Sequence, residues 1–378
     1  MLHNGILKLS LKSTWRNQGC RVLFRAASKS ANFTGLIENE LRQVSPGIRE
    51  LLSSKFEELS KCSRYYTIAQ GKQMRPSLVL LVSKATSLCS GIDQSIVGSN
   101  FLEDDAPDHV STGQVLPSQL RLAQITEMIH TASLLHDDVI DHASSRRGHP
   151  SSNVAFGNRK SVLTGNFILG RASTAMARLR TPKVTELFAT VVADLVRGEF
   201  LQLKNTADTN SLELQPFHFD YYIEKTYLKT ASLISKSCQS AAILGQCSPT
   251  VIEAAADYGR YVGTAFQLMD DVLDYTSQDE TLGKAANADL NLGLATAPVL
   301  FAWKQYPELG AMVINRFNCP SDVKKARELV ESTDGIEATV KWANDYILKA
   351  HEALQCIPDS PARQALHAVA EKVVARNY

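Results

Sequence analysis

The chain has no excess of either charge: 40 Lys and Arg stand against 39 Asp and Glu in 378 residues, a formal net charge of +1. This balance does not favour nucleic acid or another polyanion as a partner. No apolar run approaches the roughly 20 residues that a transmembrane helix needs. With 44% apolar and 21% charged residues, the composition is that of an ordinary globular protein of one large domain or two.

Cysteines are few and scattered, and none of them forms a CxxC pair. Their number is odd, so neither a disulfide framework nor a zinc site is expected, and a reducing compartment fits better. They stand at positions 20, 62, 89, 238, 247, 319 and 356.

The first 37 residues contain no acidic side chain, since the first Glu or Asp is Glu38, but they contain several Lys, Arg and Ser. A basic, serine-bearing and acid-free segment without a continuous apolar core is typical of a mitochondrial presequence. The alternative is a disordered basic tail. The sequence therefore predicts a targeting segment over 1–37, a functional domain over 38–378, and the mitochondrial matrix as the location.

Alternating strand patterns with turn dipeptides are also scarce, whereas helical periodicity is present in nearly every window after residue 38. The segment "SQLRLAQITEMIHTASLLHDDVID", for example, continues for more than 20 residues without Gly or Pro. We expect an all-α protein, a single large bundle of long helices. The polar, Gly- and Pro-containing segment 90–117 is predicted to be an exposed loop, and its acidic residues are interpreted as solvated.

Two acidic clusters with the same spacing, DDxxD, follow apolar helical segments. Residues four apart share a helix face, so Asp137 lies beside Asp141 and Asp270 beside Asp274. Like charges at this spacing destabilise a helix and call for a counter-charge, and hard oxygen ligands select Mg²⁺, which completes its shell with water and phosphate. The alternative is that each cluster is a solvated helix end. The candidate metal ligands are Asp137, Asp138, Asp141, Asp270, Asp271 and Asp274.

Cationic side chains occur close to these clusters or within apolar helices. Arg146 and Arg147 follow the first cluster, and Lys229 lies within an apolar helix where an unpaired ammonium would be unfavourable. Each cation alone is more often a surface charge, but their association with the clusters favours a diphosphate site. The others are Lys72 and Arg75 in "GKQMRP" and Lys284 in "LGKAANADL".

These motifs resemble the trans-isoprenyl diphosphate synthases, in particular their long-chain polyprenyl branch in ubiquinone side-chain biosynthesis. The resemblance runs from about residue 40 to the end of the chain. It rests on "GKQMRP", "EMIHTASLLHDDVIDHASSRRGHP", "VRGEFLQL", "KTASLI", "AFQLMDDVLDYT" and "LGKAANADLNLGLATAPVLFA", in the order of the family.

The resemblance implies an isoprenoid synthase fold with a central cavity and Mg²⁺-dependent elongation of an allylic diphosphate, such as farnesyl or geranylgeranyl diphosphate, by successive isopentenyl diphosphates. It implies a homodimer or a hetero-oligomer with a divergent second subunit. Peripheral membrane association through the apolar product is a further expectation.

The resemblance also assigns roles to single residues. The six aspartates above would bind Mg²⁺, and Lys229 would assist catalysis. The allylic diphosphate would be held by Arg146, Lys229, Thr230, Gln267 and Lys284. Isopentenyl diphosphate would be held by Lys72, Arg75, His130 and Arg147. The small residues Ala132 and Ser133 would form the floor of a deep product tunnel and permit a long product.

Three positions depart from the family pattern: Gln70 stands where a Gly is frequent, Asn166 where an Asp is common, and Leu294 where short-chain members carry a lysine. No carboxylate role is therefore assigned at position 166, and no cation at position 294. Three alternatives remain: a non-catalytic partner subunit, a shorter-chain synthase, and a terpene cyclase or head-to-head coupling enzyme. Both DDxxD motifs are intact, which argues against the first, and the "GKxxRP" block argues against the last.

Overall fold

The computed structural model describes residues 33–68, 73–89, 114–207, 219–276 and 288–375. The predicted targeting segment lies outside these residues except for its last five positions, and most of the predicted loop 90–117 lies outside them too. Residues 33–378 belong to one compact unit.

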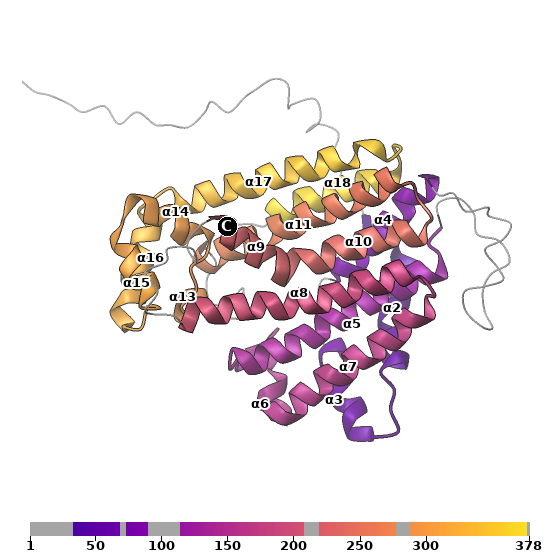
Figure 1. Ribbon diagram of the computed structural model, residues 1–378, viewed down its shortest axis with the longest axis horizontal. Coiled ribbons are helices and arrows are strands. Elements are labelled where there is room, and N and C mark those ends of the chain that lie inside the picture. The colour runs from indigo at the N-terminus through magenta and orange to yellow at the C-terminus, as the bar shows by residue number, and fades with distance from the viewer. Residues whose placement is uncertain (1–32, 69–72, 90–113, 208–218, 277–287, 376–378) are drawn as a thin grey trace, which may run out of the picture. The chain divides into compact units, whose positions relative to one another are not determined.

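The described residues are almost entirely helical, and the predicted all-α bundle is confirmed. Figure 1 shows the long helices running roughly parallel or antiparallel to one another. The α-helices are α2 (Glu38–Leu51), α3 (Glu57–Ile68), α4 (Met74–Thr86), α5 (Pro117–Ile140), α6 (Ser152–Phe156), α7 (Asn158–Arg178), α8 (Pro182–Ala207), α9 (Phe219–Thr226), α10 (Ser232–Leu244), α11 (Pro249–Thr276), α13 (Ala288–Asn291), α14 (Ala297–Gln305), α15 (Glu308–Ile314), α16 (Pro320–Glu331), α17 (Gly335–Ala353) and α18 (Pro361–Val374).

Shorter elements connect them. Three 3₁₀ turns, a π-helical turn and a two-stranded ribbon complete the described structure: η1 (Phe33–Leu36), η2 (Ser87–Cys89), η5 (Leu354–Cys356), the π turn η4 (Tyr227–Ala231), β1 (Ser145–Arg146) and β2 (His149–Pro150). None of the helices in the described parts combines the length and the apolar character needed for a membrane crossing.

Helix α11 is the centre of the core and packs most extensively against α17 and α10. Two glycines allow its close approach to α10 and η4. A Cβ at Gly259 would lie 2.8 Å from the Cα of Ser235, and one at Gly263 would lie 2.7 Å from the Cα of Ala231. Because these contacts involve backbone atoms, a larger side chain cannot be accommodated without moving a helix. The second acidic cluster at the end of α11 is thereby brought next to η4.

The chain reverses direction just after the first acidic cluster. Asp141 caps the C-terminus of α5, and β1 pairs with β2 in antiparallel register, with Arg146 opposite His149. The two residues between the strands, Arg147 and Gly148, both have positive φ, 53° and 76°. A two-residue turn of this kind matches the twist of a β-hairpin. The hairpin returns Arg146 toward the helix that carries the first cluster.

Candidate active site

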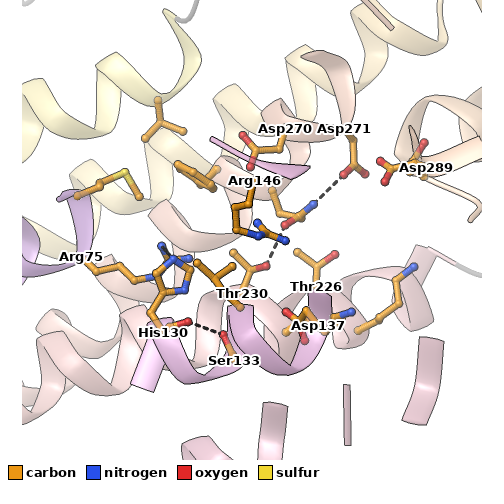
Figure 2. Close-up of a pocket in the computed structure, with 18 of the residues that line it drawn as sticks. Arg75, His130, Ser133, Asp137, Arg146, Thr226, Thr230, Asp270, Asp271 and Asp289 are labelled. Atoms are coloured by element: carbon orange, nitrogen blue, oxygen red, sulfur yellow. Dashed lines mark hydrogen bonds between the residues drawn. The ribbon is translucent and has the colours of Figure 1, made fainter. Parts of the chain in front are cut away.

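A cavity of 1220 Å³ lies between helices that are far apart in the sequence, which confirms the central cavity expected for the bundle. Its wall includes residues of α4, α5, η4, α11 and α18, and Figure 2 shows acidic and basic side chains from several of these elements around one space. On α5 and its C-cap the lining residues follow a helical period and form one face: Glu127, His130, Ser133, Leu134, Asp137 and Asp141.

The two outer aspartates of the first cluster line the cavity, but Asp138 does not. The Asp138 side chain is completely buried. One of its oxygens accepts hydrogen bonds from the Arg146 guanidinium, at 2.7 Å from Nε and 2.5 Å from Nη2. The other accepts a hydrogen bond from the Tyr66 hydroxyl, which itself accepts one from the backbone N–H of Ser152 at 2.8 Å. Asp138 therefore positions Arg146 at the rim of the cavity, and a metal-binding role for it stays a prediction.

Asp137 carries a charge that its surroundings compensate only in part. Burial raises the pKa of its carboxyl to about 7; the Lys229 ammonium opposes this shift, while Glu199 and Asp141 add to it. Lys229 itself is held by Glu199 at 2.6 Å and by the amide oxygen of Gln202 at 2.8 Å. A bound cation would restore the ionised form of Asp137.

The second cluster is also divided, but at different positions of the motif. Asp270 and Asp271 line the cavity, whereas Asp274 is buried outside its lining and accepts a hydrogen bond from the backbone N–H of Asp289 at 3.3 Å. Asp271 accepts hydrogen bonds from Tyr222 Oη at 2.6 Å, Gln267 Nε2 at 3.0 Å and the N–H of Ala297 at 3.2 Å. Burial, with a contribution from the charge of Asp289, nevertheless raises the pKa of Asp271 to about 7.

Lys229 and Thr230 lie in the π turn η4, and both line the cavity. The Thr230 hydroxyl donates to Gln267 Oε1 at 2.9 Å, and the amide nitrogen of Gln267 donates to Asp271, as the dashed lines in Figure 2 show. A π turn widens the helix locally and is frequent at functional sites. The predicted allylic residues Lys229, Thr230 and Gln267 are thus brought together beside the second cluster.

The residues predicted to hold isopentenyl diphosphate also meet in the cavity. Arg75, His130 and Arg147 line it, and Arg75 Nη1 donates to His130 Nε2 at 3.0 Å. Burial lowers the pKa of His130 well below its usual value, and Arg75 and Arg147 lower it further, so the ring is neutral. Figure 2 shows Arg75 and His130 side by side on the wall. This part of the site therefore offers several hydrogen-bond donors, and the aspartates of the first cluster do not occupy it.

Of the two residues predicted to form the tunnel floor, the structure places only Ser133 on the cavity wall. Ser133 is partly exposed, and its hydroxyl donates to the carbonyl of His130 at 2.9 Å. Ala132 has no exposed surface and packs in the hydrophobic core. The geometry thus supports a chain-length role for Ser133 more than for Ala132. Lys72 and Lys284, two further predicted diphosphate ligands, lie outside the described residues.

Several cavity residues were not singled out from the sequence. Burial raises the pKa of the Glu127 carboxyl, whereas the positive charges of Arg75 and Arg147 lower it. Its place three residues before His130 on one helix face is the signal that could have found it. For the other missed residues, the only signals in the sequence are the "VRGEFLQL" block and the "NADL" segment. The cavity residues missed are Glu127, Gln202, Tyr222, Lys225 and Asp289, and Glu199, the ion-pair partner of Lys229, was missed as well.

The donor set fits a hard divalent cation. Within the described residues no three acidic, histidine or cysteine side chains come close enough to form a complete metal site of their own. Mg²⁺ needs only one or two carboxylates from the protein and takes its other ligands from water and substrate phosphates. One oxygen of Glu199, Oε1, is buried without a hydrogen-bond partner in the described part of the chain. Asp137, Asp141 and Asp270 could therefore hold such an ion once a phosphate is present.

The known proteins to which this chain is similar include polyprenyl synthases. The sequence profile of a family described as polyprenyl synthetase matches residues 56–330, more than half of the chain. The chain is 72% identical to "Decaprenyl-diphosphate synthase subunit 1" of Schizosaccharomyces pombe over 354 residues, 94% of each chain. It is 51% identical to "Probable hexaprenyl pyrophosphate synthase, mitochondrial" of Neurospora crassa, over 90% of this chain and 81% of that one.

A solved structure agrees with the fold. The polyprenyl synthase of Caulobacter crescentus, complexed with calcium and isoprenyl diphosphate, superposes with a TM-score of 0.78 at 30% identity. The match covers 92% of this chain and 98% of the other.

Different effects are expected from neutralising the two adjacent aspartates of the first cluster. Asp138→Asn leaves the partly buried Arg146 without its counter-ion, so the free energy of unfolding should fall by about 3 kcal/mol. Asp137→Asn replaces a carboxylate whose pKa burial raises, despite the nearby Lys229, with an amide and should leave the melting temperature unchanged or raise it. Thermal unfolding of the metal-free variants measures both, and equal losses for the two would contradict the division of roles.

Proposed function

Since the chain belongs to the polyprenyl synthetase family, and is a trans-prenyltransferase, we propose that it elongates an allylic diphosphate with successive isopentenyl diphosphates to a long all-trans polyprenyl diphosphate. One observation carries the proposal: Asp137 and Asp141 on α5 and Asp270 on α11 line the same cavity as Lys229 and Arg75. Carboxylates for a metal and cations for phosphates therefore converge from helices that are distant in the sequence.

The leaving diphosphate is held at the end of the cavity that carries the acidic clusters. Mg²⁺ bound by Asp137, Asp141 and Asp270 would supply positive charge to it. The Lys229 ammonium and the Arg146 guanidinium, each fixed by a neighbouring carboxylate, add further charge without having to reorganise. The allylic C–O bond breaks with its electron pair going to the diphosphate. The oxygens of Thr230 and Gln267 lie next to this end and suit a developing allylic cation.

The second substrate is held by the group of donors around His130. Arg75 and Arg147 offer charge to the diphosphate of isopentenyl diphosphate, and the neutral imidazole keeps the Arg75 fork in place. The double bond of this substrate then attacks the allylic cation, forming a C–C bond, and a proton is lost to the released diphosphate. Positioning and charge stabilisation are sufficient for this chemistry, so no protein nucleophile is needed.

Elongation by the purified chain is the direct test. With Mg²⁺, farnesyl diphosphate and labelled isopentenyl diphosphate, residues 38–378 should give products longer than the primer, alone or after addition of a partner chain. Asp270→Ala should reduce the rate by at least about 100-fold, the cost of losing one charge stabiliser in a water-poor site. Product chromatography separates the alternatives: no elongation under either condition favours a non-catalytic subunit, and products that stop early favour a shorter-chain synthase.

Product length provides a second test. Ser133→Phe places a ring on the cavity wall and should shorten the product, whereas Ala132→Phe overpacks the core and should lower stability by about 1–3 kcal/mol instead. Chromatography of the products and thermal unfolding distinguish the two effects. An unchanged product length for Ser133→Phe, in a folded enzyme, would refute the tunnel assignment.

We also propose that the enzyme acts in the mitochondrial matrix and that its product becomes the ubiquinone side chain. The relative from Neurospora crassa is named mitochondrial, and the acid-free segment 1–37 of this chain is typical of a presequence. A long polyprenyl product is apolar, so peripheral association with the membrane through this product is part of the proposal.

A second subunit is proposed to cover part of α7 and α8. Large apolar side chains are exposed there, and Phe200, next to the ion-pair partner of Lys229, Glu199, is 69% exposed. The name of the Schizosaccharomyces pombe relative contains "subunit 1", which supports an assembly of more than one chain. The exposed apolar residues are Val162, Leu163, Val196, Phe200 and Leu203.

Light scattering checks this assembly. The chain alone, or with its divergent partner, should have the mass of an oligomer, and Phe200→Asp should dissociate it because a charge would enter an apolar contact. An active monomer at assay concentration would contradict the proposal.

A further inference from the structure

Lys225 is a second lysine on the cavity wall, one helical turn before Lys229. In "EKTYLKT" a Lys-Thr pair occurs twice at a spacing of four residues, and all four side chains, Lys225, Thr226, Lys229 and Thr230, line the cavity. Residues four apart lie on one helix face, so the two lysines point to the same side. Figure 2 shows Thr226 and Thr230 among the side chains that line the cavity.

The position of Lys225 is not explained by a helix end. Although Lys225 lies in the last turn of α9, the chain continues without a break through η4 into α10. Its ammonium therefore does not compensate the free carbonyls that would make a basic residue favourable at a true C-terminus.

The two lysines differ in their partners. The Lys229 ammonium is bonded to Glu199 and Gln202, at 2.6 Å and 2.8 Å. In the part of the chain that the structure describes, the Lys225 ammonium has neither an ion pair nor a hydrogen bond. It lies over the Tyr222 ring, whose centroid is 5.7 Å away, near the distance limit of a cation–π interaction.

The acidic residues nearby do not need Lys225 as a direct partner. Asp271 already accepts hydrogen bonds from Tyr222, Gln267 and Ala297. Burial lowers the pKa of Lys225, while the charges of Asp271 and Asp289 raise it. The partly buried Lys225 ammonium lines the cavity without a bonded partner among the described residues, so an anion in the cavity would find an available donor there.

We propose that Lys225 is a further ligand of the diphosphate of the allylic substrate, donating to its oxygens beside Lys229 on the side of the second acidic cluster. This inference rests on the proposed function, because it names an additional cation for the same leaving group. The Lys225 ammonium then stabilises the negative charge that grows on the diphosphate as the allylic bond breaks. Thr226, from the same Lys-Thr pair, offers a hydroxyl to the same wall.

Lys225→Met tests the inference, with Lys304→Met as the matched control. Lys304 also lies over an aromatic ring, that of Phe219 at 4.3 Å, but it does not line the cavity. Lys225→Met should raise the KM for the allylic diphosphate by about 10- to 100-fold, the value of one charge-assisted hydrogen bond. It should weaken binding of inorganic pyrophosphate with Mg²⁺, measured by calorimetry, by a similar factor. The KM for isopentenyl diphosphate should stay within about twofold.

Lys225→Arg should retain most of the pyrophosphate affinity, and Lys304→Met should change none of these quantities. An unchanged pyrophosphate affinity in Lys225→Met, or an equal rise in KM for both substrates, would overturn the inference. Thermal unfolding shows whether a variant is folded, and for a variant that is not folded the milder Lys225→Gln replaces it in the same titration. If the wild-type chain does not elongate, the proposed function fails, while the pyrophosphate titration still decides the role of Lys225.

Discussion

The placement of like charges in a buried space is the constraint on which the rest of the structure depends. Asp137 and Asp271 lie in positions where burial raises their pKa to about 7, and each has another carboxylate nearby. Such a site is costly in the absence of a cation and becomes favourable when one binds. Gly259 and Gly263 allow the close backbone packing of α11 against α10 and η4, which places the second cluster beside the π turn.

Each acidic cluster divides its residues between ligand binding and support. In the first, Asp137 and Asp141 face the cavity while Asp138 fixes Arg146. In the second, Asp270 and Asp271 line the cavity while Asp274 accepts a hydrogen bond from the backbone N–H of Asp289. The helix period brings the third aspartate of each motif to the side of the first, but the supporting residue differs: it is the second aspartate in the first cluster and the third in the second. The supporting carboxylates thereby position the charged side chains that line the cavity.

Much of this could be predicted from the sequence, because the signals are local. Helical periodicity revealed the bundle, and four-residue spacing placed Asp137 with Asp141. The inward direction of Asp138 and the burial of Ala132 could not be predicted, since each depends on which neighbouring helix covers that face. Glu199 and Lys225 were missed for the same reason: their approach to the cavity is set by the packing of α8 and α9 against the π turn.

The most direct test of the account is a crystal structure with Mn²⁺ and an unreactive analogue of the allylic diphosphate. Anomalous scattering locates the metal ions independently of the protein density. The account predicts Mn²⁺ between the diphosphate and Asp137 and Asp141 on one side, and Asp270 on the other, with Lys229 on the phosphate oxygens. A diphosphate bound without metal contacts to one of these clusters, or bound outside the cavity, would contradict it.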